Sequence, residues 1–362
     1  MAGAVTLTIR VVASPGEAHV AVVRDDILID YTLWRPGAPD GVGDIVMGRV
    51  TGVVRALAGA FVALPKAEGF LPDSEGAKDL TAGTVLPVRI IRSAQGGKGP
   101  RLSARLPAGA TPGPGPNPVE RMAARYPGAP VVTDDLAMAA LLGRGARVVP
   151  DLLDENVAEA IEALARPEVD IPGGGRLSIW PTPALVAVDV DSGGALGNQS
   201  GSAQRRHTAF NKALLPALAR QIRLRDLSGA IVVDLAGMPA KRRSALAPDV
   251  TAALADDPVR PRFLGFTALG LAEIVRPRVH PPLHELLSSP LAAGLAALRA
   301  VLAAGGADPR TMPALRAHPS VIAALQADPA ALRDMIRRTG RVVVLRSDPT
   351  TGDRSWSLES DG

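Results

Sequence analysis

The chain has 362 residues, a net charge of +4 and no cysteine. Disulfides and thiolate zinc sites are therefore excluded, and we expect no zinc. No apolar stretch is long enough to cross a bilayer and the N-terminus lacks a secretory signal pattern, so we expect a cytoplasmic protein without a membrane partner. The length predicts two to four structural units.

The N-terminal segment alternates apolar and polar side chains in two runs, Val5–Val12 and His19–Tyr31. Alternation with a period of two is typical of a half-buried strand. Ser14, Pro15 and Gly16 separate the runs, and these residue types favour a turn. We therefore predict a β-hairpin.

Short apolar runs between Gly43 and Leu106 are separated by turns that contain glycine. Regularly spaced short strands of this kind are typical of a small β-barrel. The next segment, Pro107–Pro118, is rich in proline and glycine, which disfavour both helix and sheet. We predict a linker there, at a domain boundary.

Helical and strand patterns alternate after the linker, which predicts an α/β layer. The predicted helices are Val119–Tyr126, Leu136–Leu142 and Asn156–Ala165, and the predicted strands are Ala129–Thr133 and Ala146–Pro150.

The centre of the chain, Ala184–Met238, has the pattern strand, helix, strand. One apolar run carries Asp189 and Asp191 near its end, and a second apolar run carries Asp234. Between them, Asn211–Asp226 has leucine and isoleucine at helical spacing with arginines interspersed, as in an amphipathic basic helix.

These three carboxylates predict a metal site. Asp189 and Asp191 are two residues apart and point to the same face of a regular strand, where Asp234 can meet them from a neighbouring strand. A carboxylate in an apolar strand is costly unless a cation or hydrogen bonds offset its desolvation. Oxygen ligands favour Mg²⁺ or Mn²⁺. The alternative is that the acids cap turns or helices and pair with nearby arginines.

Further elements follow towards the C-terminus. The predicted helices are Ser244–Ala255, Leu271–Val275, Leu291–Ala304, Ser320–Gln326 and Pro329–Arg338, and strands are predicted at Arg262–Thr267, from Gly340 and at Ser355–Leu358.

Three motifs occur in order before Asp234: Asp-Val-Asp-Ser-Gly from Asp189, Thr-Ala-Phe-Asn from Thr208, and Arg-Gln-Ile-Arg-Leu-Arg-Asp-Leu from Arg220. They resemble the catalytic region of the ribonuclease E/G family, and the chain resembles a short, ribonuclease G-like member. The resemblance implies an endoribonuclease, a hydrolase that cleaves single-stranded RNA during RNA processing or decay. It also implies that Asp189 and Asp234 hold Mg²⁺, with Mn²⁺ as the alternative ion. Asp191 would be a third ligand or orient water.

The same resemblance implies an α/β multidomain fold, with an RNase H-like and DNase I-like catalytic region and an inserted OB-fold β-barrel. The implied units are the N-terminal hairpin of the RNase H-like subdomain (1–36), the OB-fold RNA-binding domain (37–106), the linker (107–118), the remainder of the RNase H-like subdomain (119–170), the DNase I-like catalytic region (171–287) and a small C-terminal α/β domain (288–362).

Candidate RNA contacts come from the barrel and from arginine clusters. Phe61, Phe70 and Lys98 match the family's RNA-contacting positions, and single strands bind to exposed aromatics and nearby cations. The alternative is that Phe61 or Phe70 fills the barrel core. Basic clusters are expected to flank the acids and suit a phosphate backbone; they are Arg205–His207, Arg220–Arg225, Lys241–Arg243 and Arg276–Arg278. Arg223 and Arg225 are the candidate RNA contacts among them. The alternative there is a solvated helix face.

The chain departs from the family pattern around the acids. Asp191 stands where the family usually has Asn, Gly237 where it has Asp, Ala213 where it has Glu, and Ala268-Leu269 where it has Arg-Phe. A counterpart of the domain that senses 5′-monophosphates is missing, so we expect reduced or absent sensing. The cysteine zinc-link is also missing, which leaves a homo-oligomer without it as an open alternative. The changed surroundings of the acids motivate a second hypothesis, an RNA-binding protein with weak or lost nuclease activity.

Overall fold

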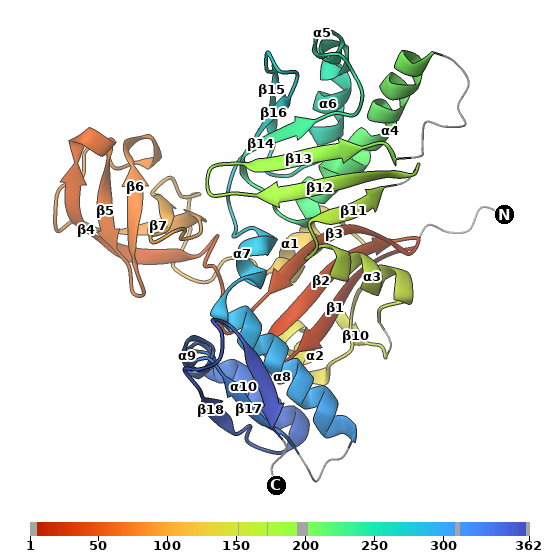
Figure 1. Ribbon diagram of the computed structural model, residues 1–362. Helices are drawn as coiled ribbons and strands as arrows, with labels where there is room; N and C mark the ends of the chain where they lie inside the picture. The colour runs from red at the N-terminus through yellow and green to blue at the C-terminus, as the bar shows by residue number, and fades with distance from the viewer. Residues whose placement is uncertain (1–5, 151, 172, 194–201, 308–311, 360–362) are drawn as a thin grey trace.

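The computed structural model describes residues 6–150, 152–171, 173–193, 202–307 and 312–359. Within these ranges the strands form a five-stranded sheet, a six-stranded sheet, a three-stranded sheet and a closed barrel. The fold is a mixed α/β arrangement with a closed five-stranded barrel, which confirms the predicted class at that level. Figure 1 shows the barrel to one side of the two large sheets, with the C-terminal unit below them. None of the described helices is both long and apolar enough to cross a membrane.

The five-stranded sheet begins with three antiparallel strands instead of the predicted hairpin. The run His19–Tyr31 is divided by Asp25 and Asp26, whose φ angles of 48° and 60° form a tight two-residue turn of the kind that suits right-twisted hairpins. Aspartate tolerates this left-handed conformation. The hairpin prediction was therefore wrong by one strand. The strands are β1 (Leu7–Ser14), β2 (Glu17–Arg24), β3 (Ile27–Trp34), β9 (Val131–Thr133) and β10 (Ala146–Val148), in the order β10-β9-β1-β2-β3.

The helices of this unit lie close to their predicted positions. They are α1 (Pro118–Arg125), α2 (Leu136–Leu142) and α3 (Glu155–Ala163). Asn117 begins α1 with a capping box, in which its side chain accepts hydrogen bonds from two backbone N–H groups and the Glu120 carboxylate accepts one from the Asn117 N–H.

The barrel is made of β4 (Ile45–Val54), β5 (Gly59–Ala63), β6 (Glu68–Pro72), β7 (Val85–Arg92) and β8 (Arg101–Ser103), with short turns η1 (Arg55–Leu57) and η2 (Asp73–Glu75). Its fully buried side chains are Val50, Ala60, Val62, Leu71, Ala77, Val88 and Leu102. The linker is anchored to it, because Ile45 and Gly113 exchange two backbone hydrogen bonds.

The six-stranded sheet contains the predicted strand, helix, strand unit. Its strands are β11 (Glu168–Ile171), β12 (Gly175–Pro181), β13 (Val186–Asp191), β14 (Gly229–Asp234), β15 (Arg262–Phe266) and β16 (Ala272–Arg276), in the order β11-β12-β13-β14-β16-β15. Its helices are α4 (Ala203–Leu224), α5 (Ala240–Arg243) and α6 (Ala247–Leu254), with the turn η4 (Ser244–Leu246) before α6.

Two predictions in this unit need correction. The helix predicted at Leu271–Val275 is the strand β16, which pairs with both β14 and β15. Ala272, Ile274 and Arg276 are buried while the residues between them are less so, which is the period-two pattern of a strand. Helix α4 begins eight positions before the predicted Asn211, where the Ser202 side chain caps it.

The C-terminal unit contains α7 (Leu283–Leu287), α8 (Pro290–Ala307), α9 (Pro319–Ala327) and α10 (Pro329–Thr339), with the strands β17 (Ala314–Ala317), β18 (Leu345–Ser347) and β19 (Trp356–Glu359). Sequence patterns missed β17 and placed the start of β18 too early.

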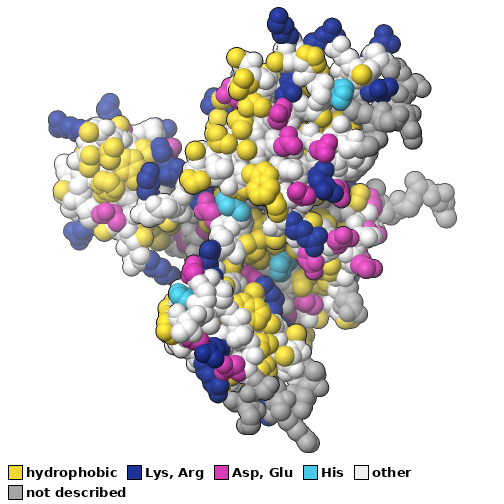
Figure 2. All heavy atoms as spheres, in the orientation of Figure 1, with side chains coloured by type: hydrophobic (Ala, Val, Ile, Leu, Met, Phe, Trp, Pro, Cys, Tyr) yellow, Lys and Arg dark blue, Asp and Glu magenta, His cyan; other side chains and the backbone are white. Residues whose placement is uncertain are grey.

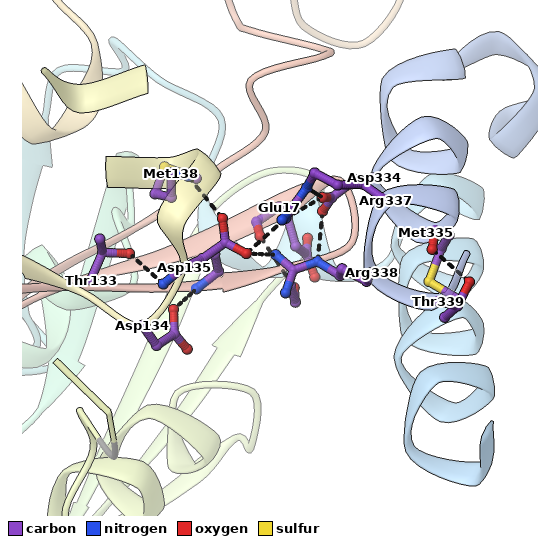
Figure 3. A network of polar contacts seen from close by, with 12 residues as sticks. Glu17, Thr133, Asp134, Asp135, Met138, Asp334, Met335, Arg337, Arg338 and Thr339 are labelled. Carbon is purple, nitrogen blue, oxygen red and sulfur yellow. Dashed lines mark hydrogen bonds and ion pairs between the residues drawn. The ribbon is translucent and has the colours of Figure 1, made fainter. Parts of the chain in front are cut away.

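Ion pairs and one close approach dock the C-terminal unit on the N-terminal sheet. Asp135 lies 2.7 Å from Arg337 and 3.1 Å from Arg338 of α10, as the dashed lines in Figure 3 show. A Cβ atom at Gly16 would come within 2.5 Å of the Ala331 Cβ, so the turn between β1 and β2 touches α10. Glu17, next to that turn, is buried and pairs with Arg299 of α8.

Candidate functional site

The three predicted acids lie together at the carboxyl ends of β13 and β14. These strands are parallel, and Asp189 is the register partner of Asp234. Neighbouring strands lie about 4.8 Å apart, and paired residues point to the same face. Asp191 is one pleat further along β13, opposite Arg176 of β12. The structure therefore brings together the three carboxylates that sequence reasoning selected.

The acids project from the face of the sheet that α4 does not cover. Val188, Val190 and Val233, which alternate with them, are buried in one core with α4. Asp189, Asp191 and Asp234 are all exposed. The arrangement offers a solvent-accessible group of carboxylate oxygens over a rigid pair of strands.

Asp234 already has a cationic neighbour, which comes from the Lys241–Arg243 cluster expected to flank the acids. Arg243 of α5 lies 2.6 Å from Asp234 Oδ1, and its guanidinium also donates to the Met238 and Gly270 carbonyl oxygens. The Arg243 side chain is 11% exposed, while that of Asp234 is 52% exposed. Arg243 thus holds Asp234 from the protein side and leaves the carboxylate open to solvent.

Asp191 also has a local partner, since its Oδ1 accepts a hydrogen bond of 2.8 Å from the Gly193 N–H. The alternative that these acids cap turns and pair with arginines is therefore observed for Asp191 and Asp234. Residues 194–201, which follow Gly193 in the sequence, lie outside the described residues.

The donor chemistry fits a hard divalent cation in part. Asp189 and Asp234 supply two exposed oxygen donors from adjacent strands. In the described part of the chain, no cluster of three or more Asp, Glu or His side chains is arranged to hold a metal ion. A metal bound between the two aspartates would share Asp234 with Arg243.

His207 is a neighbour of the site that sequence reasoning missed as an individual residue. Gly237, three positions after Asp234, has a φ of +60°, and a Cβ there would come within 2.1 Å of the His207 ring. The imidazole therefore fills the place that a side chain at 237 would need. Buried Asn211 fixes this contact by donating to the His207 and Ala236 carbonyl oxygens. The only sequence signal was the cationic run that ends at His207.

The arginines predicted to contact RNA lie elsewhere. Helix α4 runs back from the end of β13 to the start of β14, so its last turn lies at the end of the sheet remote from the acids. Arg225 is 6% exposed, and it donates to the Ala163, Leu164 and Arg166 carbonyl oxygens. Burial lowers the pKa of Arg225 to about 10. Arg225 is thus occupied in joining α4 to α3, and the prediction that it flanks the acids was wrong.

Arg223 is partly occupied in a similar way. Its guanidinium donates to the Ile29 carbonyl oxygen at 2.8 Å, and its Nε lies 3.9 Å from buried Asp30. It also lies on the last turn of α4, away from Asp189.

The barrel residues form a separate surface. Phe61 and Phe70 are register partners on β5 and β6, and their rings meet edge to face with centroids 5.5 Å apart. Both side chains are half-buried and neither belongs to the barrel core, so the core alternative is wrong. Lys98 is exposed in the turn before β8. Figure 2 shows apolar and basic side chains side by side on the barrel.

Comparison with known proteins finds a family model that matches part of the chain. The model of the Ribonuclease E/G family matches residues 147–279, the stretch that contains Asp189, Asp191 and Asp234. Over these residues the chain is similar to the Ribonuclease E/G family. It is 37% identical to a Ribonuclease E of Nostoc sp. over 134 residues, which are 36% of this chain and 19% of that protein.

Two Escherichia coli proteins are also similar to part of the chain. Ribonuclease E is 35% identical over 38% of this chain and 13% of its own length, and Ribonuclease G is 32% identical over 40% of this chain and 29% of its own length. The matched stretch thus spans less than a third of each of these relatives. A solved structure, the solution structure of GSP13 from Bacillus subtilis, is 31% identical over 23% of this chain and 69% of its own, with a TM-score of 0.17.

Proposed function

We propose that this protein is a Mg²⁺-dependent endoribonuclease that cleaves single-stranded RNA. The observation that carries the proposal is the pairing of Asp189 with Asp234 on adjacent parallel strands inside the ribonuclease E/G region. Relatives that match part of the chain are named Ribonuclease E and Ribonuclease G, which supports an endoribonuclease. The fold alone would not support an activity, so the argument rests on the site.

In this proposal Asp189 and Asp234 hold the ion, and Mn²⁺ is the alternative to Mg²⁺. A bound divalent ion would supply an activated water and neutralise charge on the scissile phosphate. Asp191 acts as a third oxygen ligand or orients the water. Arg243 keeps Asp234 on the open face of the sheet through its contact with Oδ1.

The barrel supplies the RNA-binding surface in the proposal. We assign it as an OB-fold, in which Phe61 and Phe70 stack on bases and Lys98 contacts the phosphate backbone. Residues 1–36 and 119–170 would form an RNase H-like subdomain, and 171–287 a DNase I-like catalytic region, with the C-terminal unit at 288–362. A homo-oligomer formed without a zinc-link belongs to the same proposal.

One observation favours a second candidate function, an RNA-binding protein with weak or lost nuclease activity. Arg243 pairs with Asp234, and in the described ranges no third acid or histidine completes a metal cluster with Asp189 and Asp234. A guanidinium that competes with the metal would lower its affinity without affecting the barrel surface.

The deciding experiment is cleavage of a labelled, unstructured RNA by the purified full chain with Mg²⁺ and with chelator. Asp189→Asn and Asp234→Asn remove one proposed ligand charge each, and we expect both to abolish cutting while RNA affinity stays near that of the parent. Glu159→Gln, at an exposed carboxylate on α3, is the matched control and should cut normally. Cutting at the parental rate by either aspartate variant would show that the site is misassigned. Metal-independent binding without cutting by the parent would favour the second candidate.

A further inference from the structure

A large groove lies on the side of α4 that faces away from the six-stranded sheet. It has a volume of about 870 Å³ and is bounded by α4, α6, α1 and the strands β2 and β3. The volume is in the range of a small-molecule site. Because the acids project from the opposite face of that sheet, the groove is separate from the proposed catalytic site.

Cations dominate the lining of the groove. Five basic side chains and two carboxylates line it. The basic residues are Arg24, Arg125, Lys212, Arg220 and Arg223, and the acidic residues are Asp249 and Asp256. A third carboxylate, Asp30, is buried behind the wall.

Most of the acids are already engaged by particular cations. Lys212 pairs with Asp249 at 3.1 Å, and Arg125 pairs with Asp30 at 2.7 Å. Tyr126 also donates its hydroxyl hydrogen to Asp30. These pairs stabilise the walls, whereas no carboxylate among the described residues forms an ion pair with Arg220.

Arg220 is half-buried, and its Nε is a buried atom without a hydrogen-bond partner in the described structure. Burial lowers the pKa of Arg220, and the positive charge of Arg223 one turn away lowers it further. A desolvated guanidinium beside a second one is unfavourable unless an anion offsets both charges. The Nε of Arg223 also lacks a hydrogen-bond partner among the described residues.

We propose that this groove binds a phosphate group, carried by a nucleotide or by a strand of RNA, between Arg220 and Arg223. The planar fork of a guanidinium matches two oxygens of a phosphate, and charge-assisted contacts of this kind are the stronger hydrogen bonds in proteins. Arg24, exposed at the rim, adds long-range attraction. The site goes beyond the proposed nuclease and does not depend on it, because it uses neither the aspartates nor a metal.

The test is binding of pyrophosphate to the full chain by calorimetry, with chelator present so that no metal contributes. Arg220→Gln keeps the length of the side chain and removes the charge, and we expect it to weaken binding about tenfold, from the loss of a charge-assisted pair. Arg24→Gln changes an exposed residue that does not threaten folding, and a loss of roughly twofold to threefold is expected there.

Arg144→Gln is the matched control, because Arg144 is an exposed arginine in the turn between α2 and β10 and does not line the groove. Unchanged pyrophosphate affinity in both Arg220→Gln and Arg24→Gln would overturn the proposal, and so would an equal loss in Arg144→Gln. Two further arms identify the carrier of the phosphate. Loss of AMP binding in Arg220→Gln assigns the groove to a nucleotide, while weaker binding of an RNA of about 20 nucleotides, with a shallower salt dependence, assigns it to a strand.

Discussion

Gly237 offers a direct check on the packing beside the candidate site. Gly237→Ala adds a Cβ at a φ of +60°, which costs about 1–2 kcal/mol for an L-residue in the left-handed region. The same Cβ would lie 2.1–2.6 Å from three atoms of the His207 ring, so the ring must move. Displacing a packed side chain costs typically about 1–3 kcal/mol. We expect a total loss of roughly 2–5 kcal/mol in the free energy of unfolding.

The matched control for this prediction is Gly229, which begins β14. Its φ is +84°, but a Cβ there would meet nothing within 4 Å. Gly229→Ala therefore isolates the backbone cost and should destabilise by only about 1–2 kcal/mol. Urea denaturation, followed by a probe in the six-stranded sheet, measures both variants.

A double variant separates the clash from the backbone strain. His207→Ala removes the ring, so adding Gly237→Ala to it should cost no more than the change at Gly229, with a coupling of about 1–3 kcal/mol between the two positions. Equal losses for Gly237→Ala and Gly229→Ala, with no coupling to His207, would refute the contact between the ring and the loop after Asp234.

The remaining predictions concern the barrel and the response to pH. Phe61→Ala and Phe70→Ala should each weaken RNA binding by about 1–3 kcal/mol, the usual value of one stacked base, and titration of a labelled single strand checks this. Arg278 donates two hydrogen bonds of 2.7 Å to Glu285 and lowers the pKa of that carboxyl. The ion pair stabilises the fold fully at pH values above the pKa of Glu285 in the unfolded chain, which is about 4.3. This stabilisation is lost as the pH falls through the lower pKa that Glu285 has in the folded protein. Because this pair is partly exposed, Glu285→Gln should remove under about 1 kcal/mol at neutral pH and none in acid, as denaturation at several pH values will show.

The local elements could be predicted where one face of each is apolar. Helix α2 has the predicted bounds, and β13 and β14 end in the predicted acids because alternating valines define both strands. The register of Asp189 with Asp234 follows from two strands of equal pattern joined by one helix. These features depend on near neighbours in the sequence.

The errors lie where partners distant in the sequence decide the outcome. The apolar run that forms β16 is too short for its pattern to distinguish a helix from a strand. It is a strand because it pairs with β14. In the sequence Arg225 is indistinguishable from a solvated arginine. The structure shows that it donates a hydrogen bond to the Ala163 carbonyl oxygen at the end of α3. The contact between Arg243 and Asp234 depends on the path of the loop after β14, which residue types alone do not specify.

The strand order β10-β9-β1-β2-β3 also has a consequence for how the chain folds. The first three strands end at Trp34, yet β9 begins at Val131, so the sheet cannot be completed until the whole barrel has been synthesised. The buried core of the barrel is made entirely of its own residues, so it can form first. Once formed, the barrel replaces a long flexible connection between β3 and β9 with a compact unit. This lowers the entropic cost of bringing β9 to β1. Barrel substitutions that slow its folding should therefore delay the pairing of β1 with β9, even though the two strands share no core residue with it.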